Sequence, residues 1–435
     1  MSARNRELMA LLPASLLLTA GFAAIFIQQS EQLSDVSLTY GAVFLGLCVA
    51  GHFVIRFTLP YADPYLFPLV SVLACFGLVV IYRIDDTLAR EQAQWFVVGL
   101  VLFAATIVLL RDFRVLERYR YTIALAGLLL LLLPRVPGIG QQANGAYLGV
   151  KLGPVAFQPA EFGKIAIIIF LAAYLRDTRQ VLVQGSRRFL GVTFPPLKHL
   201  GPLLMVWGAA MFMLVFIRDL GSSLMYFGGF LALLYVATNR LSFVAIGLGM
   251  FALGAWFFAS TVGHVQLRVD TWLHPFEPGL IDKPGGSYQI AQSLFAQADG
   301  GLLGTGLGGS LLRGPTGNTL IPAPDTDLIY AVITNELGLV GACGLLAVFL
   351  LVVQRGFKIA ELAGDSFSKL LATGLTAVFA LQVFVIVGGV TKVIPLTGVT
   401  LPFVSYGGSS ILANFILLAL LLLMSDRARR EGGAR

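Results

Sequence analysis

The sequence is dominated by long apolar runs separated by short polar segments. About 20 consecutive apolar residues cross a bilayer core as a helix, and the runs lack the period of two that barrel strands show. A helix also satisfies its own backbone hydrogen bonds in lipid. The pattern therefore predicts an all-α polytopic membrane protein with about twelve transmembrane helices, at residues 8–29, 39–58, 65–84, 93–110, 120–134, 162–175, 200–217, 220–237, 242–260, 327–353, 368–391 and 405–424.

Composition agrees with this class. Of the 435 residues, 57% are hydrophobic and only 12% are charged, about half the charged fraction of a soluble domain. The three cysteines lie in apolar runs without a disulfide or metal spacing, and the four histidines form no cluster. These features argue against a secreted disulfide scaffold and against a dedicated metal site.

The basic residues indicate the topology. With a cytoplasmic N-terminus, roughly two thirds of the 30 lysines and arginines fall in segments on the inner side, as the positive-inside rule requires. Both termini are therefore predicted to be cytoplasmic. The net charge of +7 reflects this topology, and we expect no nucleic-acid partner.

Three segments predicted to lie outside are rich in Gly and Pro: 135–161, 261–326 and 392–404. A 66-residue connection such as 261–326 is far longer than an ordinary loop and is typically functional. It contains the apolar piece "YQIAQSLFA", which suits a re-entrant or interfacial position. Any chemistry should therefore face outward.

Charged residues at the outer ends of the predicted spans are the candidate site. Such residues usually face a bundle interior or a water-filled cavity, and we expect these to converge on one outward-opening cavity. They are Glu161, Lys164, Arg218, Asp219, Asp325, Asp327 and Lys392.

Each of these residues also has a purely structural interpretation. Glu161 and Lys164 are three residues apart and suit an intrahelical ion pair. Arg218 and Asp219 can pair within a turn, Lys392 can extend to the interface, and Asp325 can cap the tenth span.

The residue types suggest chemistry on a lipid-linked diphosphate. Lys and Arg at a membrane surface suit phosphate groups, and a carboxylate in a partly dehydrated pocket suits a general base. The same set of groups also suits a protein that moves such a lipid, and composition leaves both open.

Five ordered motifs resemble the SEDS family (shape, elongation, division and sporulation), which includes FtsW, RodA and SpoVE. "FQPAEFGK" is similar to its Q-P-[SA]-E-x-x-K segment, and "RDLGSSL" to its P-D-L-G-T-[AS]-L turn. "YQIAQSLFAQADGGLLGTG" resembles Y-Q-x-x-Q-S…G-G-x-x-G-x-G. "DTDLIYAVITNELG" resembles H-T-D-F-I-F-A…E-[EL]-G, and "PLTGVTLPFVSYGGSS" matches P-[VL]-T-G-x-x-L-P-F-[IV]-S-Y-G-G-[ST]-S.

The resemblance implies a domain plan and an activity. It implies a ten-span core over 63–424, preceded by a two-helix extension at 1–62 and followed by a basic cytoplasmic tail at 425–435. The activity implied is a peptidoglycan glycosyltransferase in the bacterial cytoplasmic membrane. It would polymerise lipid II, an undecaprenyl diphosphate-linked disaccharide pentapeptide, on the outer face during elongation or division. The implied partners are a class B penicillin-binding protein and membrane lipids.

The family pattern also implies residue roles. Asp327 is the expected catalytic base, Asp325 and Glu336 are modulators, and Glu336 is expected to brace the bundle against Lys164 or another polar group. The expected substrate-binding residues are Glu161, Lys164, Arg218, Asp219, Arg268, Gln289, Ser293, Lys392 and Ser405.

The chain departs from the family pattern at three places. Asp325 replaces a His, Arg218 replaces a Pro, and "NGAYLG" replaces a G-A-[RK]-R-W segment. Two further classes stay open, a lipid II flippase and a non-catalytic scaffold for a penicillin-binding protein. We expect no cofactor, although a weak Mg²⁺ dependence stays open, because a carboxylate pair can bind that ion.

Overall fold

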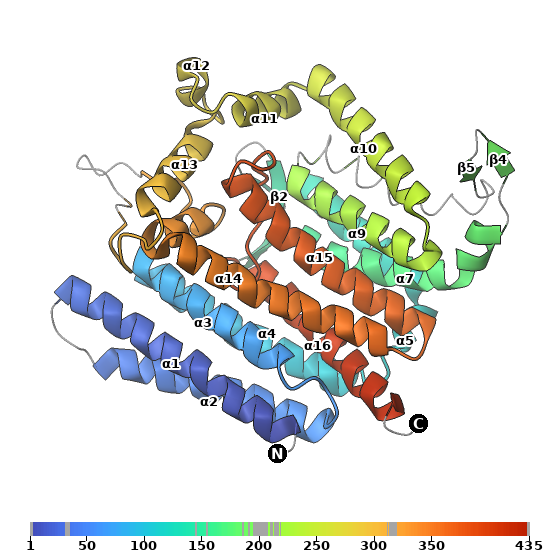
Figure 1. The fold of residues 1–435 in the computed structure, drawn as a ribbon, viewed down its shortest axis with the longest axis horizontal. Helices are drawn as coiled ribbons and strands as arrows, with labels where there is room; N and C mark the ends of the chain where they lie inside the picture. The colour runs from blue at the N-terminus through green and yellow to red at the C-terminus, as the bar shows by residue number, and fades with distance from the viewer. Residues whose placement is uncertain are drawn as a thin grey trace. The chain divides into compact units, whose positions relative to one another are not determined.

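The computed structural model describes residues 3–30, 35–143, 146–153, 155–184, 187–189, 192–194, 208, 212, 217, 219–310, 312 and 320–432. Its long helices (Figure 1) are α1 (Ala3–Ser30), α2 (Asp35–Thr58), α3 (Leu66–Ile84), α4 (Asp86–Leu109), α6 (Arg120–Leu132), α7 (Pro159–Gln184), α9 (Leu220–Thr238), α10 (Leu241–Thr261), α14 (Ile329–Leu362), α15 (Ser366–Val390) and α16 (Gly408–Gly432). The short helical elements are α5 (Val115–Arg118), the 3₁₀ helix η1 (Leu133–Arg135), α11 (Gly263–Leu273), α12 (Pro278–Ile281) and α13 (Tyr288–Gly300).

The helices confirm the predicted fold class. Among the described residues, nine helices are long and apolar enough to span a membrane: α1, α2, α3, α4, α9, α10, α14, α15 and α16. Helices α6 and α7 occupy the fifth and sixth predicted spans. The seventh predicted span, 200–217, lies almost entirely outside the described residues.

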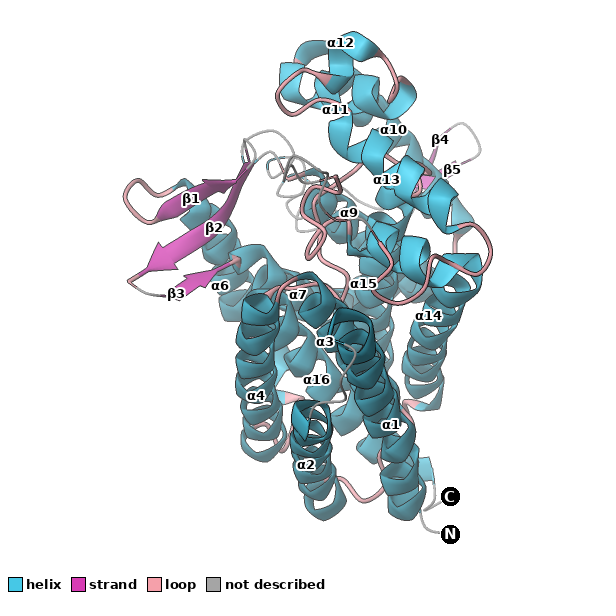
Figure 2. Ribbon diagram, turned by 90° about the vertical axis from the view of Figure 1, so that its left-hand side faces the viewer, coloured by secondary structure: helices cyan, strands magenta, loops and turns pink. Residues whose placement is uncertain are grey.

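Two small sheets form where the sequence predicts only loops. Strands β1 (Gly140–Ala143), β2 (Ala146–Leu152) and β3 (Val155–Phe157) make an antiparallel sheet in that order, seen in Figure 2. Strands β4 (Arg187–Phe189) and β5 (Val192–Phe194) form a hairpin. Strand β2 contacts α7, so the first sheet lies against the helix that carries Glu161 and Lys164.

The chain divides into two compact units, which are described separately. Unit 1 comprises Met1–Arg111, Asp270–Arg355 and Gln382–Arg435, and unit 2 comprises Asp112–Val269 and Gly356–Leu381. The two-helix extension belongs to unit 1 together with both ends of the core, and the predicted domain plan stays a prediction. The predicted basic tail is also helical as far as Gly432, since α16 continues through it.

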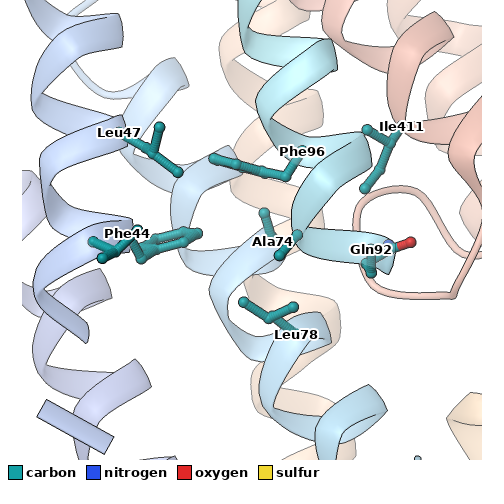
Figure 3. Close-up of a pocket in the computed structure, with 9 residues that line it drawn as sticks. Phe44, Leu47, Ala74, Leu78, Gln92, Phe96 and Ile411 are labelled. Carbon is teal, nitrogen blue, oxygen red and sulfur yellow. The ribbon is translucent and has the colours of Figure 1, made fainter. Parts of the chain in front are cut away.

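Aromatic packing holds the helices of unit 1 together. Phe415 on α16 makes edge contacts with Phe96 and Phe103 on α4, at ring-centroid distances of 5.3 and 6.1 Å. Gly99 allows this approach, because a β-carbon there would lie 2.4 Å from the Phe415 ring. On the other side of α4, Phe44 of α2 packs 5.1 Å from Phe96. Next to Phe44 and Phe96 lies a pocket lined mostly by apolar side chains of α2, α3, α4 and α16, which we call the apolar pocket (Figure 3).

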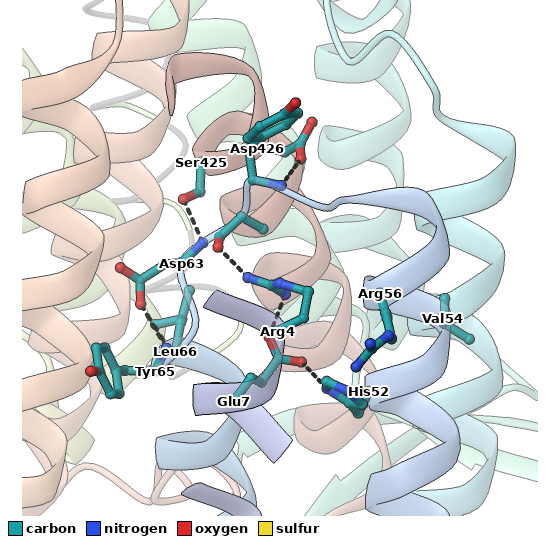
Figure 4. Close-up of polar contacts among 12 residues, drawn as sticks. Arg4, Glu7, His52, Val54, Arg56, Asp63, Tyr65, Leu66, Ser425 and Asp426 are labelled. Atoms are coloured by element: carbon teal, nitrogen blue, oxygen red, sulfur yellow. Dashed lines mark hydrogen bonds and ion pairs between the residues drawn. The ribbon is translucent and has the colours of Figure 1, made fainter. Parts of the chain in front are cut away.

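A buried polar junction ties the two-helix extension to the core at the end of unit 1 that holds both termini (Figure 4). We use "polar junction" for Arg4, Glu7, His52, Asp63 and Asp426. Glu7 pairs with Arg4, its Oε1 lies at hydrogen-bond distance from His52 Nδ1 at 2.8 Å, and Arg4 also donates to the Ala62 carbonyl. The Asp426 carboxylate on α16 accepts from the Tyr61 amide at 2.8 Å. The ends of α1, α2 and α16 are therefore joined by groups buried from solvent.

Helix α14 is broken at Gly338, where φ is 66° and ψ is −172°. The segment 300–310, called the glycine loop, supplies the missing hydrogen bonds. The amides of Thr305 and Gly306 donate to the carbonyls of Asn335 and Glu336 at 2.9 and 3.0 Å. On the other side of the break, the Leu339 amide donates to the carbonyl of residue 301 at 3.0 Å. The break is satisfied within the protein, as backbone at membrane depth must be.

Glu7→Gln tests the polar junction. Removing this carboxylate takes away the anion that pairs directly with the buried Arg4, so we expect a loss of about 3 kcal/mol or more in unfolding free energy. Glu361→Gln is the control, because that side chain is 70% exposed in its pair with Lys358 and should cost less than about 1 kcal/mol. The measurement is the thermal midpoint in detergent, and equal midpoints for both variants would contradict the prediction.

Candidate functional site

The two candidate aspartates lie in a turn that precedes α14. We call residues 323–328 the aspartate turn. Helix α14 begins at Ile329, so the expectation that Asp325 caps the tenth span is wrong. The turn closes on itself instead, since the amides of Thr326 and Leu328 donate to the Ala323 carbonyl at 3.3 and 3.1 Å. Ala323 has a φ of 45°, a left-handed conformation that reverses the chain.

Residues 401–407 hold the aspartate turn from the other side. The Tyr406 amide donates to the Asp325 carbonyl at 2.8 Å, and Ser405 Oγ donates to the Thr326 carbonyl at 2.8 Å. Ser405 Oγ in turn accepts from the Leu401 amide at 2.9 Å. Its hydroxyl is therefore engaged in fixing the backbone beside Asp327.

Gln92 on α4 extends this network. Its amide nitrogen donates to the Ser405 carbonyl at 3.0 Å, and its Oε1 accepts from the Gly407 amide at 3.2 Å. Figure 3 shows Gln92 between the apolar pocket and this loop. The sequence analysis missed Gln92. Gln92 lies one residue before the fourth predicted span, in a polar stretch where it does not stand out from its neighbours.

The Asp327 carboxylate faces a turn of the Pro-Leu-Thr-Gly motif. A β-carbon at Gly398, where φ is 75°, would lie 3.5 Å from Asp327 Oδ2. Glycine accommodates the left-handed backbone at this position, and the carboxylate lies directly beside that turn. Asp327 is half-buried, which suits a base that must meet a substrate without being fully hydrated.

Asp325 has an environment that weakens its acidity. Burial raises the pKa of its carboxyl, and the negative charge of Asp85 raises it further, while a hydrogen bond from its own backbone amide lowers it. The net pKa is above the ordinary value. Asp325 is therefore the carboxyl of the turn that holds a proton more readily than an exposed aspartate.

Unit 2 contains a second group of polar residues, called the lysine cluster: the buried Glu161, Lys164, Asp219 and Tyr226, together with the half-buried Arg268. Lys164 Nζ and Glu161 Oε2 are 2.5 Å apart, and both side chains are almost fully buried. The interpretation as an intrahelical pair is therefore confirmed. Tyr226 on α9 donates to the Ala160 carbonyl at 2.7 Å, which ties α9 to the start of α7.

Asp219 has a structural role at the start of α9. Its carboxylate caps the helix, accepting from the Ser222 amide at 2.9 Å and from the Ser222 hydroxyl at 2.5 Å. Burial raises its pKa and the charge of Glu161 adds to this, whereas Ser222 and the positive charge of Arg268 lower it. Arg268 and Glu161 thus both act electrostatically on the Asp219 carboxyl. Arg218 lies outside the described residues.

The remaining predicted residues are near the end of α15. Ser293 on α13 is buried and donates to the Val390 carbonyl at 2.9 Å, while Gln289 on the same helix is half-buried. Lys392 has a left-handed φ of 62°, and its carbonyl accepts from Trp272 Nε1 at 3.0 Å. Ser293 and the Lys392 backbone thus anchor α13 and α11 to the end of α15.

Glu336 pairs with a residue that the sequence analysis did not consider. Its Oε1 lies 3.2 Å from Arg83 Nε at the end of α3, and Lys164 pairs with Glu161. Arg83 is therefore the other polar group that the expectation allowed. The general expectation that Glu336 braces the bundle against a polar group is confirmed.

The structure thus brings Asp325, Asp327 and Ser405 together in unit 1, and Glu161, Lys164, Asp219 and Arg268 together in unit 2. The expectation that both groups share one cavity stays a prediction. Among the described residues, no three His, Cys, Asp or Glu side chains are arranged to hold a metal ion.

Comparison with known proteins gives consistent matches. Residues 64–430 match the family model FTSW_RODA_SPOVE, described as "Cell cycle protein". The chain is 42% identical to the peptidoglycan glycosyltransferase RodA of Mycobacterium bovis, over 98% of this chain and 91% of that protein. It is 31% identical to stage V sporulation protein E of Bacillus subtilis, over 83% and 93%.

A solved structure is also similar. It is a chain from work on the structural coordination of polymerization and crosslinking by a peptidoglycan synthase complex. The TM-score is 0.66 at 27% identity, over 85% of this chain and 98% of that one.

Asp325→Asn should stabilise the protein at neutral pH. Because the folded-state pKa of Asp325 is raised, folding opposes its ionisation; the resulting penalty is present above the folded pKa and is absent below the unfolded value of about 4. We expect a higher thermal midpoint than wild type at pH 7.5, and a gain that disappears towards pH 4. Asp299→Asn, at an exposed position, is the control. A lower thermal midpoint for Asp325→Asn than for wild type at pH 7.5 would contradict the raised pKa of Asp325.

Proposed function

The chain belongs to the FtsW, RodA and SpoVE family of cell cycle proteins, and from that premise we propose that Asp327 is the general base of its polymerisation reaction. The protein is a peptidoglycan glycosyltransferase of the multi-pass membrane type. We propose lipid II as its substrate, joined into glycan strands at the outer face of the cytoplasmic membrane.

The proposed step is an inverting glycosyl transfer. Asp327 removes the proton from the 4-hydroxyl of the acceptor sugar, and that oxygen attacks the anomeric carbon of the donor. The bond from this carbon to the diphosphate oxygen breaks, and its electron pair leaves with the lipid diphosphate. One glycosidic bond forms, one glycosyl–phosphate bond breaks, and the proton stays on the Asp327 carboxyl.

The single observation that carries this proposal is the way Asp327 is held. Its turn is fixed by Ser405 and Tyr406, and its carboxylate lies beside the left-handed backbone at Gly398. A base supported in this way meets the geometric demand of general base catalysis, which requires a preset position at hydrogen-bond distance from the acceptor. Asp325, with its raised pKa, is then a neighbour that tunes Asp327.

We assign the leaving diphosphate to basic residues of the predicted site. Arg268 on α11 is half-buried, and its charge acts on Asp219 beside the lysine cluster. The proposed diphosphate ligands are Arg268, Lys164, Lys392 and Arg218. Of the three that the structure describes, Arg268 and Lys392 are half-buried, whereas Lys164 is buried in its ion pair. Polar contact with a developing diphosphate charge stabilises the transition state.

We also propose a membrane orientation and a partner. The polar junction places the start of α1 and the end of α16 at one end of unit 1, and we propose that this end is cytoplasmic. The aspartate turn then lies at the extracytoplasmic end. The similar solved chain comes from a complex that couples polymerization to crosslinking, and we propose a class B penicillin-binding protein as the crosslinking partner. No cofactor is proposed.

Asp327→Asn should abolish polymerisation. The amide keeps the shape of the carboxylate but cannot accept the acceptor proton, so we expect a rate loss of about 10²–10⁴-fold. The assay follows glycan strands formed from lipid II by purified protein, with and without the penicillin-binding protein. Asp325→Asn is the matched control and should retain measurable activity.

The other outcomes discriminate between the alternatives. Equal polymer from wild type and Asp327→Asn would remove Asp327 from the role of base. No polymer from wild type with the correct partner present would favour the flippase or the scaffold.

A further inference from the structure

The proposed reaction leaves unused a buried ion pair at the break in α14. Glu336 is 2% exposed. Its Oε2 accepts from the Gly308 amide at 2.9 Å, and its Oε1 lies 3.2 Å from Arg83 Nε. Arg83 Nη2 donates to the carbonyls of Gly308 and Ser310 at 2.7 and 2.8 Å. The two side chains therefore hold the glycine loop between them.

The glycine loop is fitted closely into the break. A β-carbon at Gly304 would lie 2.2 Å from the Glu336 carbonyl oxygen, and one at Gly338 would lie 2.4 Å from the Gly304 nitrogen. Asn335 adds a side-chain hydrogen bond to the Ala296 carbonyl at 2.7 Å, which ties the same point to α13. The loop, the break and α13 thus form one packed contact.

Because α14 is broken at Gly338, the part of the helix before the break is oriented by its contacts with the glycine loop and not by the rest of α14. Residues 329–337, preceding Gly338, form a short helix of about 13 Å at 1.5 Å per residue. Its C-terminal carbonyls bond to the glycine loop, and its N-terminal end continues directly into the aspartate turn. The position of Asp327 therefore depends on the glycine loop at one end of this short helix and on Ser405 at the other.

We propose that Arg83 and Glu336 are positioning residues for Asp327. They fix the glycine loop, the loop fixes the short helix 329–337, and the helix fixes the aspartate turn. Neither side chain is assigned a contact with substrate. The inference rests on the proposed role of Asp327, since it states what holds that base in place. A displacement of about 1 Å in a reacting group can cost about 10²-fold in rate, so support at this distance affects the chemical step.

The alternative is a purely structural ion pair. Removing one partner of a buried pair destabilises a protein in any case, so loss of activity alone would not distinguish the two roles. The distinguishing property is local. A positioning role predicts altered dynamics of residues 323–328 and a selective fall in kcat in protein that remains folded.

The experiment uses full-length protein and three substitutions. Glu336→Gln keeps the size of the side chain and an acceptor for the Gly308 amide, but removes the charge that faces Arg83. Arg83→Gln removes the charge and the Nη2 group that donates to the Gly308 and Ser310 carbonyls, and Arg83→Lys keeps the charge without the guanidinium. Arg355→Gln is the matched control. Arg355 lies on α14, the helix of Glu336, but near the other end of that helix, where its Nη1 is 3.7 Å from Asp63 Oδ2.

Two readouts are needed. The first is kcat and KM for lipid II, measured on the folded fraction after size-exclusion chromatography. We expect kcat to fall about ten- to a hundred-fold in Glu336→Gln and Arg83→Gln, with KM changed less than about three-fold and Arg83→Lys intermediate. The second is amide hydrogen exchange, which should accelerate in peptides covering 323–328 and 300–310 but not in Arg355→Gln.

Each outcome bears on a separate claim. Unchanged exchange at 323–328, or a uniform increase over all helices, would overturn the positioning role even if activity fell. Full activity of Asp327→Asn would instead refute the proposed base, while the exchange data would still report whether Arg83 and Glu336 fix the turn. Wild-type kcat in Glu336→Gln together with an inactive Asp327→Asn would overturn the inference alone.

Discussion

The structure of unit 1 depends on satisfying backbone hydrogen bonds where α14 is broken. An open amide or carbonyl costs several kcal/mol in an apolar environment, and α14 has such groups on both sides of Gly338. The glycine loop meets them with its own amides and carbonyls. Only glycine fits where the two backbones touch, so one requirement explains the composition of the loop, the location of Glu336 and the direction of the short helix before the break.

The site shows how a catalytic position is built from backbone contacts. The aspartate turn is held mainly through its carbonyls, which accept from the Ser405 hydroxyl and the Tyr406 amide. Gln92 then joins that loop to α4. The Asp327 side chain lies beside the Gly398 turn. The lysine cluster follows a different rule, because its charges are mostly paired or capped by neighbours on the same chain.

Much of the fold could be predicted from sequence, because apolar length alone identifies a spanning helix. Element boundaries failed where local chemistry prevails over hydropathy: α14 begins at Ile329 because residues 323–328 close a turn. The small sheets were missed because short strands between spans have a weak signal. The partner of Glu336 was missed because Arg83 lies about 250 residues earlier in the sequence. Local sequence patterns do not indicate which residues so far apart come into contact.

The polar junction has a consequence for how the chain is made. Asp63 bonds Arg429, 366 residues later, and the Tyr61 amide bonds Asp426, 365 residues later. At roughly 5–20 residues per second, translation of that interval takes tens of seconds. Throughout it the first two helices are in the membrane while these partners do not yet exist, and their polar groups must stay in contact with water or lipid head groups. Insertion of this protein is therefore complete only when its last helix arrives, although its first helices are the earliest to enter the bilayer.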